Sequence, residues 1–171
     1  LEKYGLAPKK AFGQNFLVNP AIPQMIAENS YGLAESTGKR GPHAVLEIGP
    51  GVGALTCQLA RLYDRVVAVE IDRGLIPLLG ESLADFDNVE VIENDIMNVD
   101  LPKFIEEKFG DILAEISGVS IKCIGVKPAT VWKALREQKE KITIFDRIKT
   151  DKRDTFAIVL DIEKPQGARF N

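Results

Sequence analysis

The 171-residue sequence is poor in the residues that build metal and thiol chemistry, with one histidine, two cysteines and one tryptophan. Cys57 and Cys123 lack the spacing of zinc ligands, and His43 cannot complete a metal site or a catalytic triad with them. We therefore expect no metal, and two reduced cysteines in the core. No apolar stretch approaches the roughly 20 residues that span a bilayer, and the amino end lacks a signal-peptide pattern. These absences predict a cytoplasmic protein without membrane contact.

Charge is unevenly distributed along the chain. The net charge is -3, but residues 1–110 carry 10 Lys/Arg and 16 Asp/Glu, whereas residues 111–171 carry 12 and 9. This balance argues against a strongly basic nucleic-acid binder. The local basic clusters are typical of solvated faces. A hydrophobic content of 45% suffices to bury the core of one domain.

A glycine loop follows the first predicted strand. Residues 44–48 are an apolar run that suits a buried parallel strand, and three glycines alternate with other residues over 49–53. Without Cβ atoms, such a loop turns sharply and lets a ligand approach the backbone. Glu70 ends the next predicted strand at the distance where a ribose would lie, and its carboxylate would accept from two hydroxyls. The pairing predicts a cofactor that contains a nucleoside.

Two cofactor classes use this layout. The dinucleotide fingerprint G-x-G-x-x-G/A is matched from Gly49 to Ala54, which would indicate NAD. The acid-x-G-x-G-x-G pattern of methyltransferases that use S-adenosylmethionine (SAM) is matched from Glu47 to Gly53. A third predicted strand, at 89–92, leads to Asp95, whose carboxylate would accept a hydrogen bond from an adenine amino group. This second acid favours SAM.

Predicted strands and helices alternate from residue 44 to residue 109. Such alternation predicts an α/β fold with a mostly parallel, doubly wound sheet. Ligands of such sheets bind beyond the carboxyl ends of the strands, where the glycine loop, Glu70 and Asp95 fall. Asn19 is predicted to cap an earlier helix that ends near Gly32. The predicted strands are 44–48, 66–71, 89–92, 119–126 and a closing hairpin of 142–145 and 156–162, and the predicted later helices are 53–63, 73–84, 101–109 and 130–139.

Four blocks of sequence resemble the KsgA-type ribosomal RNA adenine dimethyltransferases, with the Erm resistance methyltransferases as near relatives. The resemblance extends from about residue 9 to residue 110. It implies a Rossmann-like SAM-dependent methyltransferase, with SAM as cofactor and ribosomal RNA of the small ribosomal subunit as partner. We expect a monomer in the cytoplasm that dimethylates adenine N6. The blocks are Phe12-Gly13-Gln14-Asn15-Phe16-Leu17, Leu46 to Thr56, Val69-Glu70-Ile71-Asp72 and Asn94-Asp95-Ile96.

The same resemblance implies the roles of five cofactor-binding residues. Asn15 and Leu17 would fold over the methionine end of SAM, and Gly49 would contact it through its backbone. Glu70 would hold the ribose hydroxyls, and Asp95 the adenine amino group. In this scheme, residues 1–40 form an amino-terminal lid or loop with a helix, and residues 41–171 form the Rossmann-like SAM-binding domain.

The chain departs from the family after about residue 110. Family members carry an Asn-Leu/Ile-Pro-Tyr motif, whose asparagine accepts hydrogen bonds from N6 and whose aromatic ring stacks on the base. Here the best match places Val126 at the asparagine position and Ala129 at the tyrosine position, so no catalytic residue is assigned. Since one preorganised polar group at a reacting centre contributes roughly 100- to 1,000-fold in rate, we expect severely impaired transfer. The family's carboxyl-terminal helical domain has no counterpart either.

This departure leaves alternatives open. Three explanations of residues 111–171 remain open: a gene truncated or frame-shifted after about residue 110, a chimera, or natural divergence. The strand and helix patterning of this segment favours a folded product over frame-shifted sequence. The leading function is a SAM-dependent rRNA adenine N6-dimethyltransferase. The alternative is a non-catalytic SAM- or RNA-binding module, and a third is an NAD-dependent oxidoreductase.

Overall fold

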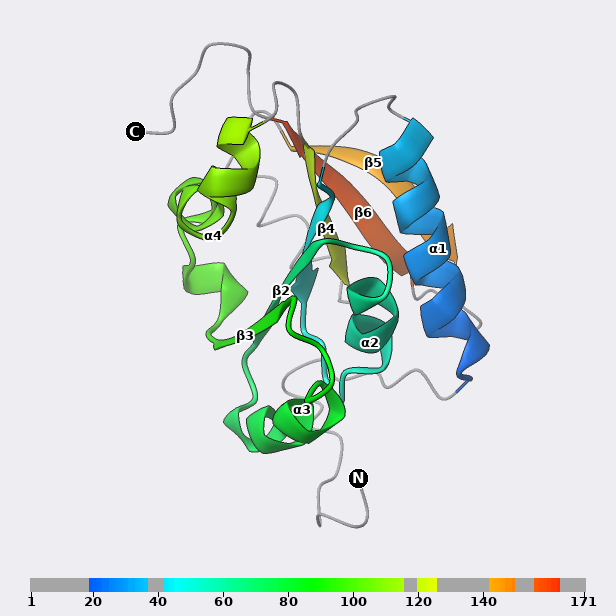
Figure 1. Cartoon of the computed structure of the whole chain (residues 1–171), viewed down its shortest axis with the longest axis vertical. Helices are drawn as coiled ribbons and strands as arrows, with labels where there is room; N and C mark the ends of the chain where they lie inside the picture. The colour runs from blue at the N-terminus through cyan, green and yellow to red at the C-terminus, as the bar shows by residue number, and fades with distance from the viewer. Residues whose placement is uncertain (1–18, 37–41, 116–119, 126–141, 150–155, 164–171) are drawn as a thin grey trace.

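A six-stranded sheet forms the centre of the computed structural model (Figure 1). The strand order is β3-β2-β1-β4-β6-β5, in which the first four strands are parallel and β6 runs antiparallel to both of its neighbours, β4 and β5. The strands are β1 (Ala44–Ile48), β2 (Arg65–Glu70), β3 (Val89–Glu93), β4 (Ser120–Gly125), β5 (Ile142–Lys149) and β6 (Phe156–Glu163). The predicted parallel sheet and closing hairpin are therefore confirmed. The structure describes residues 19–36, 42–115, 120–125, 142–149 and 156–163.

Helices cover both faces of the sheet. In Figure 1, α1 and α2 lie on one side of the strands and α4 lies on the other. The inward side of α4 buries Phe104, Ile105 and Phe109. The helices are α1 (Ala21–Ser36), α2 (Ala54–Ala60), α3 (Ile76–Ser82) and α4 (Leu101–Glu115), with 3-10 turns η3 (Arg73–Leu75) and η4 (Ile96–Asn98). The predicted helix 130–139 lies outside the described residues.

The first helix begins as predicted and ends later. Asn19 Oδ1 accepts the backbone N–H two residues ahead at 3.0 Å, which is the expected cap. The prediction that the helix ends near Gly32 was wrong, because α1 continues to Ser36. The Tyr31 ring packs edge-on against Tyr63, with the ring centroids 5.3 Å apart. Such an aromatic contact offsets the helix-propensity cost of about 1 kcal/mol at the glycine.

A polar pair inside the core joins α1 to the turn that follows α2. The Tyr63 hydroxyl donates to Ser30 Oγ at 3.0 Å, and Ser30 Oγ donates to the Ala27 carbonyl at 2.8 Å. Both Ser30 and Tyr63 are buried, so these bonds satisfy hydroxyls that water cannot reach. Burial also raises the pKa of Tyr63 well above its ordinary value. The surrounding apolar cluster comprises Ile26, Ala27, Val45, Leu55, Leu59, Ala60 and Val66.

The closing hairpin is longer than predicted. The first strand of the hairpin was predicted to end at residue 145, before the charged stretch that begins at Asp146, but β5 runs on to Lys149 and pairs with β6 up to Phe156. The pairing register shifts between Ile144 and Asp146, as at a β-bulge. Charged residues are common on edge strands, where they discourage pairing with other chains. Charge was therefore a poor signal for a turn here.

Candidate functional site

The loop between β1 and α2 depends on glycine at three positions. Gly49, Gly51 and Gly53 have φ values of 70°, 63° and 84°. This left-handed region costs other residues roughly 1–2 kcal/mol each. At Gly53 a Cβ would also lie 3.3 Å from Leu79 Cδ2 on α3. The glycines therefore shape the predicted binding loop, and the last of them also leaves room for the Leu79 side chain of α3.

Glu70 connects this loop to the end of β2. Its Oε2 accepts the backbone N–H of Gly51 at 3.0 Å, and its Oε1 accepts the backbone N–H of Asp72 at 2.8 Å. The side chain is 1% exposed. An ionised carboxylate has about four acceptor positions, so two backbone bonds leave acceptor capacity for a ligand. A ribose that reaches this carboxylate must displace the atoms that now cover it.

Two aspartates end β2 and β3 in the same way. Asp72 Oδ1 accepts the N–H of Gly74 at 3.1 Å, and Asp95 Oδ1 accepts the N–H of Met97 at 2.9 Å. Each aspartate thereby caps a 3-10 turn, η3 or η4. Asp72 is buried, whereas Asp95 is half-buried. Asp95 thus has a structural bond on one oxygen, and its Oδ2 is the oxygen that remains for a ligand.

Backbone bonds hold the three strand ends together at one edge. The Gly49 N–H donates to the Val69 carbonyl at 2.8 Å, and the Asn94 N–H donates to the Glu70 carbonyl at 3.0 Å. The glycine loop, Glu70 and Asp95 therefore lie at adjacent strand ends, as the order of the strands predicts. This edge is the usual ligand position in open parallel sheets.

Two exposed apolar side chains at this edge were not found from the sequence. Ile71 directly follows Glu70 and is 37% exposed, and Met97 lies two residues after Asp95 and is 45% exposed. They are the exposed large hydrophobic side chains of the part of the chain that the structure describes. The signal in the sequence is an apolar residue beside each acid, where the strand has already ended. Apolar surface beside polar acceptors is typical of ligand sites.

Four of the predicted site positions cannot be placed. Asn15, Leu17, Val126 and Ala129 lie outside the described residues. Within the described ranges, no group of three His, Cys, Asp or Glu side chains is arranged to hold a metal ion. None of the described helices is both long and apolar enough to cross a membrane. Cys57 is half-buried, and burial raises the pKa of its thiol.

Comparison with known proteins identifies the family of this site. The sequence matches the family described as ribosomal RNA adenine dimethylase over residues 5–158. The chain belongs to this family. The match includes the glycine loop, Glu70 and Asp95, and it extends beyond residue 110, where the short motifs no longer match.

Curated relatives of the family match about two thirds of the chain. Ribosomal RNA small subunit methyltransferase A of Leuconostoc mesenteroides is 49% identical over 111 residues, which are 65% of this chain and 35% of the relative. The protein of the same name from Anoxybacillus flavithermus is 47% identical over 112 residues, 66% of this chain and 36% of the relative. The chain therefore aligns with about a third of the length of the curated relatives it matches.

Solved structures share the fold at low identity. The N-methyltransferase NodS from Bradyrhizobium japonicum has a TM-score of 0.53 at 14% identity, covering 87% of this chain and 99% of the other. The 23S rRNA methyltransferase ErmE has a TM-score of 0.50 at 22% identity, covering 86% of this chain and 70% of the other. These likenesses establish a Rossmann-like methyltransferase fold, which is the predicted fold class.

Proposed function

We propose that this chain binds SAM at the carboxyl edge of β1, β2 and β3. The observation that carries the proposal is the bond from the Gly51 N–H to Glu70, which fixes a ribose-type acceptor against a glycine loop. Asp95 Oδ2 would accept from the adenine amino group. Ile71 and Met97 would cover the faces of the adenine, since flat bases pack well on apolar side chains. Asn15 and Leu17 are proposed to cover the methionine end, and Gly49 to contact it through its backbone.

The residues present fit this cofactor better than a dinucleotide. Three glycines with positive φ shape the loop, and two acids, Glu70 and Asp95, stand at successive strand ends. A nicotinamide dinucleotide needs only the first acid. The second acid, Asp95, has an oxygen available for a base, as SAM requires. NAD therefore serves as the negative control in binding experiments.

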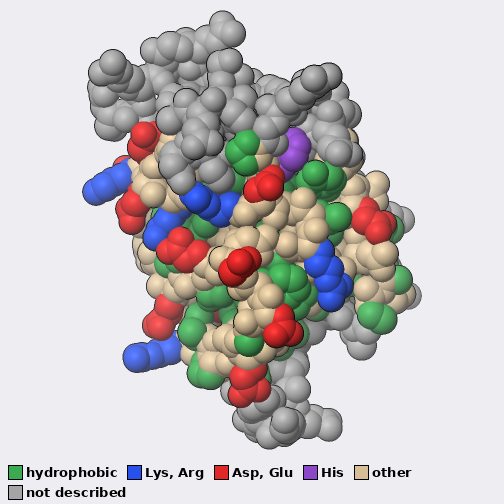
Figure 2. All heavy atoms as spheres, viewed as in Figure 1, with side chains coloured by type: hydrophobic (Ala, Val, Ile, Leu, Met, Phe, Trp, Pro, Cys, Tyr) green, Lys and Arg blue, Asp and Glu red, His purple; other side chains and the backbone are tan. Residues whose placement is uncertain are grey.

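We further propose that the reaction is methylation of adenine N6 in small-subunit ribosomal RNA. Family membership and the relatives named ribosomal RNA small subunit methyltransferase A support this substrate. Bound SAM would supply an electrophilic methyl group, so the protein has mainly to position the acceptor nitrogen. The face in Figure 2 shows basic and acidic side chains interspersed, without a broad basic patch among the described residues. We place the chain in the cytoplasm with its substrate.

A second candidate is a module that binds SAM or RNA without turnover. The sequence feature that favours it is Val126 at the position of the family's asparagine, where no acceptor for N6 is present. Ala129 likewise supplies no ring to stack on a flipped base. In its SAM-binding form, this candidate requires the same cofactor site as the enzyme and differs from it only in methyl transfer.

Transfer of labelled methyl groups from SAM to unmodified small ribosomal subunits tests the choice between them. We expect a rate about 100- to 1,000-fold below that of the Leuconostoc relative, because the preorganised acceptor is missing. The double variant Val126→Asn/Ala129→Tyr should raise the rate, and Glu70→Ala in that background should abolish it. If neither the native chain nor the double variant transfers label while both bind S-adenosylhomocysteine, the non-catalytic module is the function.

A further inference from the structure

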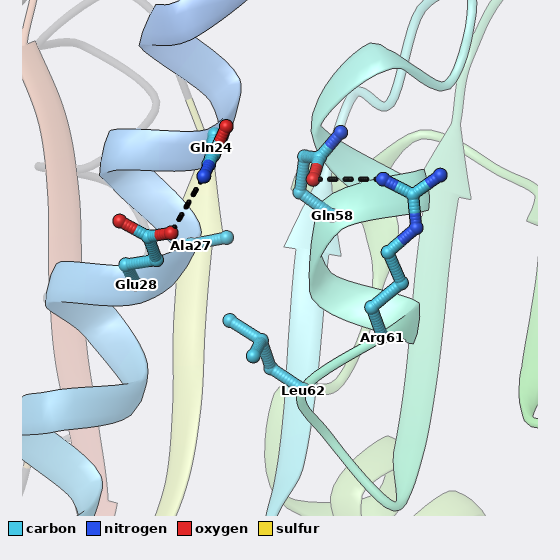
Figure 3. Close-up of a pocket in the computed structure, with 6 residues that line it drawn as sticks. All are labelled: Gln24, Ala27, Glu28, Gln58, Arg61 and Leu62. Atoms are coloured by element: carbon cyan, nitrogen blue, oxygen red, sulfur yellow. Dashed lines mark hydrogen bonds between the residues drawn. The ribbon is translucent and has the colours of Figure 1, made fainter.

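A groove between α1 and α2 lies apart from the cofactor edge. It has a volume of about 270 Å³. Leu62 supplies the accessible apolar lining, since Ala27 is fully buried, and four polar side chains complete the lining: Gln24 and Glu28 from α1, and Gln58 and Arg61 from α2 and the residue after it (Figure 3). The glycine loop precedes α2, whose seven residues extend about 10 Å, so the groove lies at the opposite end of this helix.

The two walls of the groove have opposite hydrogen-bonding character. On α1, Gln24 Nε2 donates to Glu28 Oε1 at 2.8 Å, so the amide oxygen and the second carboxylate oxygen are the acceptors of that wall. On the other wall, Arg61 Nη1 donates to Gln58 Oε1 at 3.0 Å, so the guanidinium and the amide nitrogen are its donors. Figure 3 shows each pair closed on its own side. Among the residues that the structure describes, no hydrogen bond or ion pair joins these four side chains across the groove.

An occupant must therefore donate toward one wall and accept from the other. A phosphate only accepts, and the Glu28 carboxylate would repel it. The apolar face of a nucleobase can instead pack on the half-buried Leu62 side chain. Guanine has acceptors O6 and N7 that match an arginine, and its amino group is a donor that matches a carboxylate. Adenine carries an amino group where guanine carries O6. That amino group is a donor, so it cannot form a hydrogen bond with the arginine, which is also a donor.

We propose that this groove binds an unpaired guanine of RNA, with Arg61 on O6 and N7 and Glu28 on the amino edge. Proteins recognise single-stranded RNA through such base edges, whereas phosphate contacts give little sequence information. The RNA context of this inference rests on the proposed function, but the base pocket is a separate site. It would fix the register of the RNA about one helix length from the cofactor edge.

The test uses nuclear magnetic resonance spectra of the full 15N-labelled chain titrated with guanosine. Guanosine should shift the backbone amide signals of the groove residues, whereas adenosine and inorganic phosphate should not. Arg61→Ala and Glu28→Ala should each weaken guanosine binding by at least roughly fivefold. 7-Deazaguanosine, which lacks the N7 acceptor, should also bind more weakly. Arg73→Ala removes an arginine whose side chain is 88% exposed outside the groove, and it should leave guanosine binding unchanged.

Several results would overturn the proposal. They are equal shifts with all nucleosides, shifts with phosphate alone, or no groove shifts with guanosine at millimolar concentration. S-adenosylhomocysteine is added to the same samples, and its binding is followed through the backbone amide signals of the glycine loop at 49–53 and of Glu70. If it binds and guanosine does not, the groove proposal fails while the cofactor proposal stands. If guanosine binds in the groove and S-adenosylhomocysteine does not bind, the cofactor proposal fails while the groove proposal stands.

Discussion

The Glu70 carboxylate accepts the backbone N–H of Gly51 at 3.0 Å, across 19 residues of sequence. A buried acid thus holds the glycine loop to the end of β2. The Glu70 side chain therefore has a structural role in addition to its proposed role as ribose acceptor. For variants of Glu70, the free energy of unfolding and the affinity for the cofactor have to be measured separately.

Removing the Glu70 side chain should destabilise the chain. Glu70→Ala leaves the backbone N–H groups of Gly51 and Asp72 without this acceptor in a buried environment, at a cost of about 1–3 kcal/mol. Glu70→Gln keeps one carbonyl acceptor and should lose less. Urea unfolding followed by circular dichroism measures the difference. Equal stability of the alanine variant and the native chain would mean that these bonds contribute nothing to the fold.

Two glycine substitutions should act in opposite directions. Gly53→Ala places a Cβ at φ 84° and 3.3 Å from Leu79 Cδ2, so the free energy of unfolding should fall by at least about 1–2 kcal/mol. Gly32→Ala lies inside α1, where a Cβ meets nothing within 4 Å, and should stabilise by about 0.5–1 kcal/mol. Thermal unfolding of both variants tests the pair. Destabilisation by the second substitution would contradict a continuous α1 through this residue.

Asparagine and alanine at position 95 should separate capping from binding. Asp95→Asn keeps an oxygen for the Met97 N–H, so stability should change little, while affinity for S-adenosylhomocysteine should fall with the lost carboxylate. Asp95→Ala should lower affinity too and also cost about 1 kcal/mol of stability. Calorimetric titration and urea unfolding of the two variants supply both quantities. Native affinity in Asp95→Ala would remove this residue from the proposed site.

Tyr63 should make stability sensitive to alkaline pH. Burial raises the pKa of Tyr63 in the folded chain above its unfolded value of about 10, so folding favours the neutral phenol. Its contribution is fully present below pH 10 and is lost as pH rises further, by up to about 1.4 kcal/mol per pH unit. Tyr63→Phe should lose about 0.5–1.5 kcal/mol at pH 7 with the bond to Ser30, yet decline less steeply above pH 10. Parallel slopes for both proteins between pH 9 and 11 would refute this.

The sequence predicted the parts of the fold that depend on local patterns. The apolar runs of β1 and β2, the glycines at 49–53 and the Asn19 cap are each encoded within a few residues. The end of α1 was missed because it depends on Tyr31 meeting Tyr63, which lies 32 residues later. The length of β5 was missed because its partner strand, not its own composition, determines where pairing stops.

The candidate site was predicted in its positions more than in its contacts. Strand order alone places the glycine loop, Glu70 and Asp95 at one edge. The burial of Glu70 and the exposure of Ile71 and Met97 depend on how the turns after β2 and β3 fold over their neighbours. Those turns are set by the caps at Asp72 and Asp95. In the sequence, an acid that follows a strand indicates a ligand-binding residue as readily as a cap, so these turns were not predicted.

Titration of the full chain with S-adenosylhomocysteine by isothermal calorimetry tests the central claim most directly. The account predicts micromolar binding by the native chain, much weaker binding by folded Glu70→Gln, and no binding of NAD. Absence of S-adenosylhomocysteine binding by the folded native chain, or tighter binding of NAD, would contradict a SAM site at this edge.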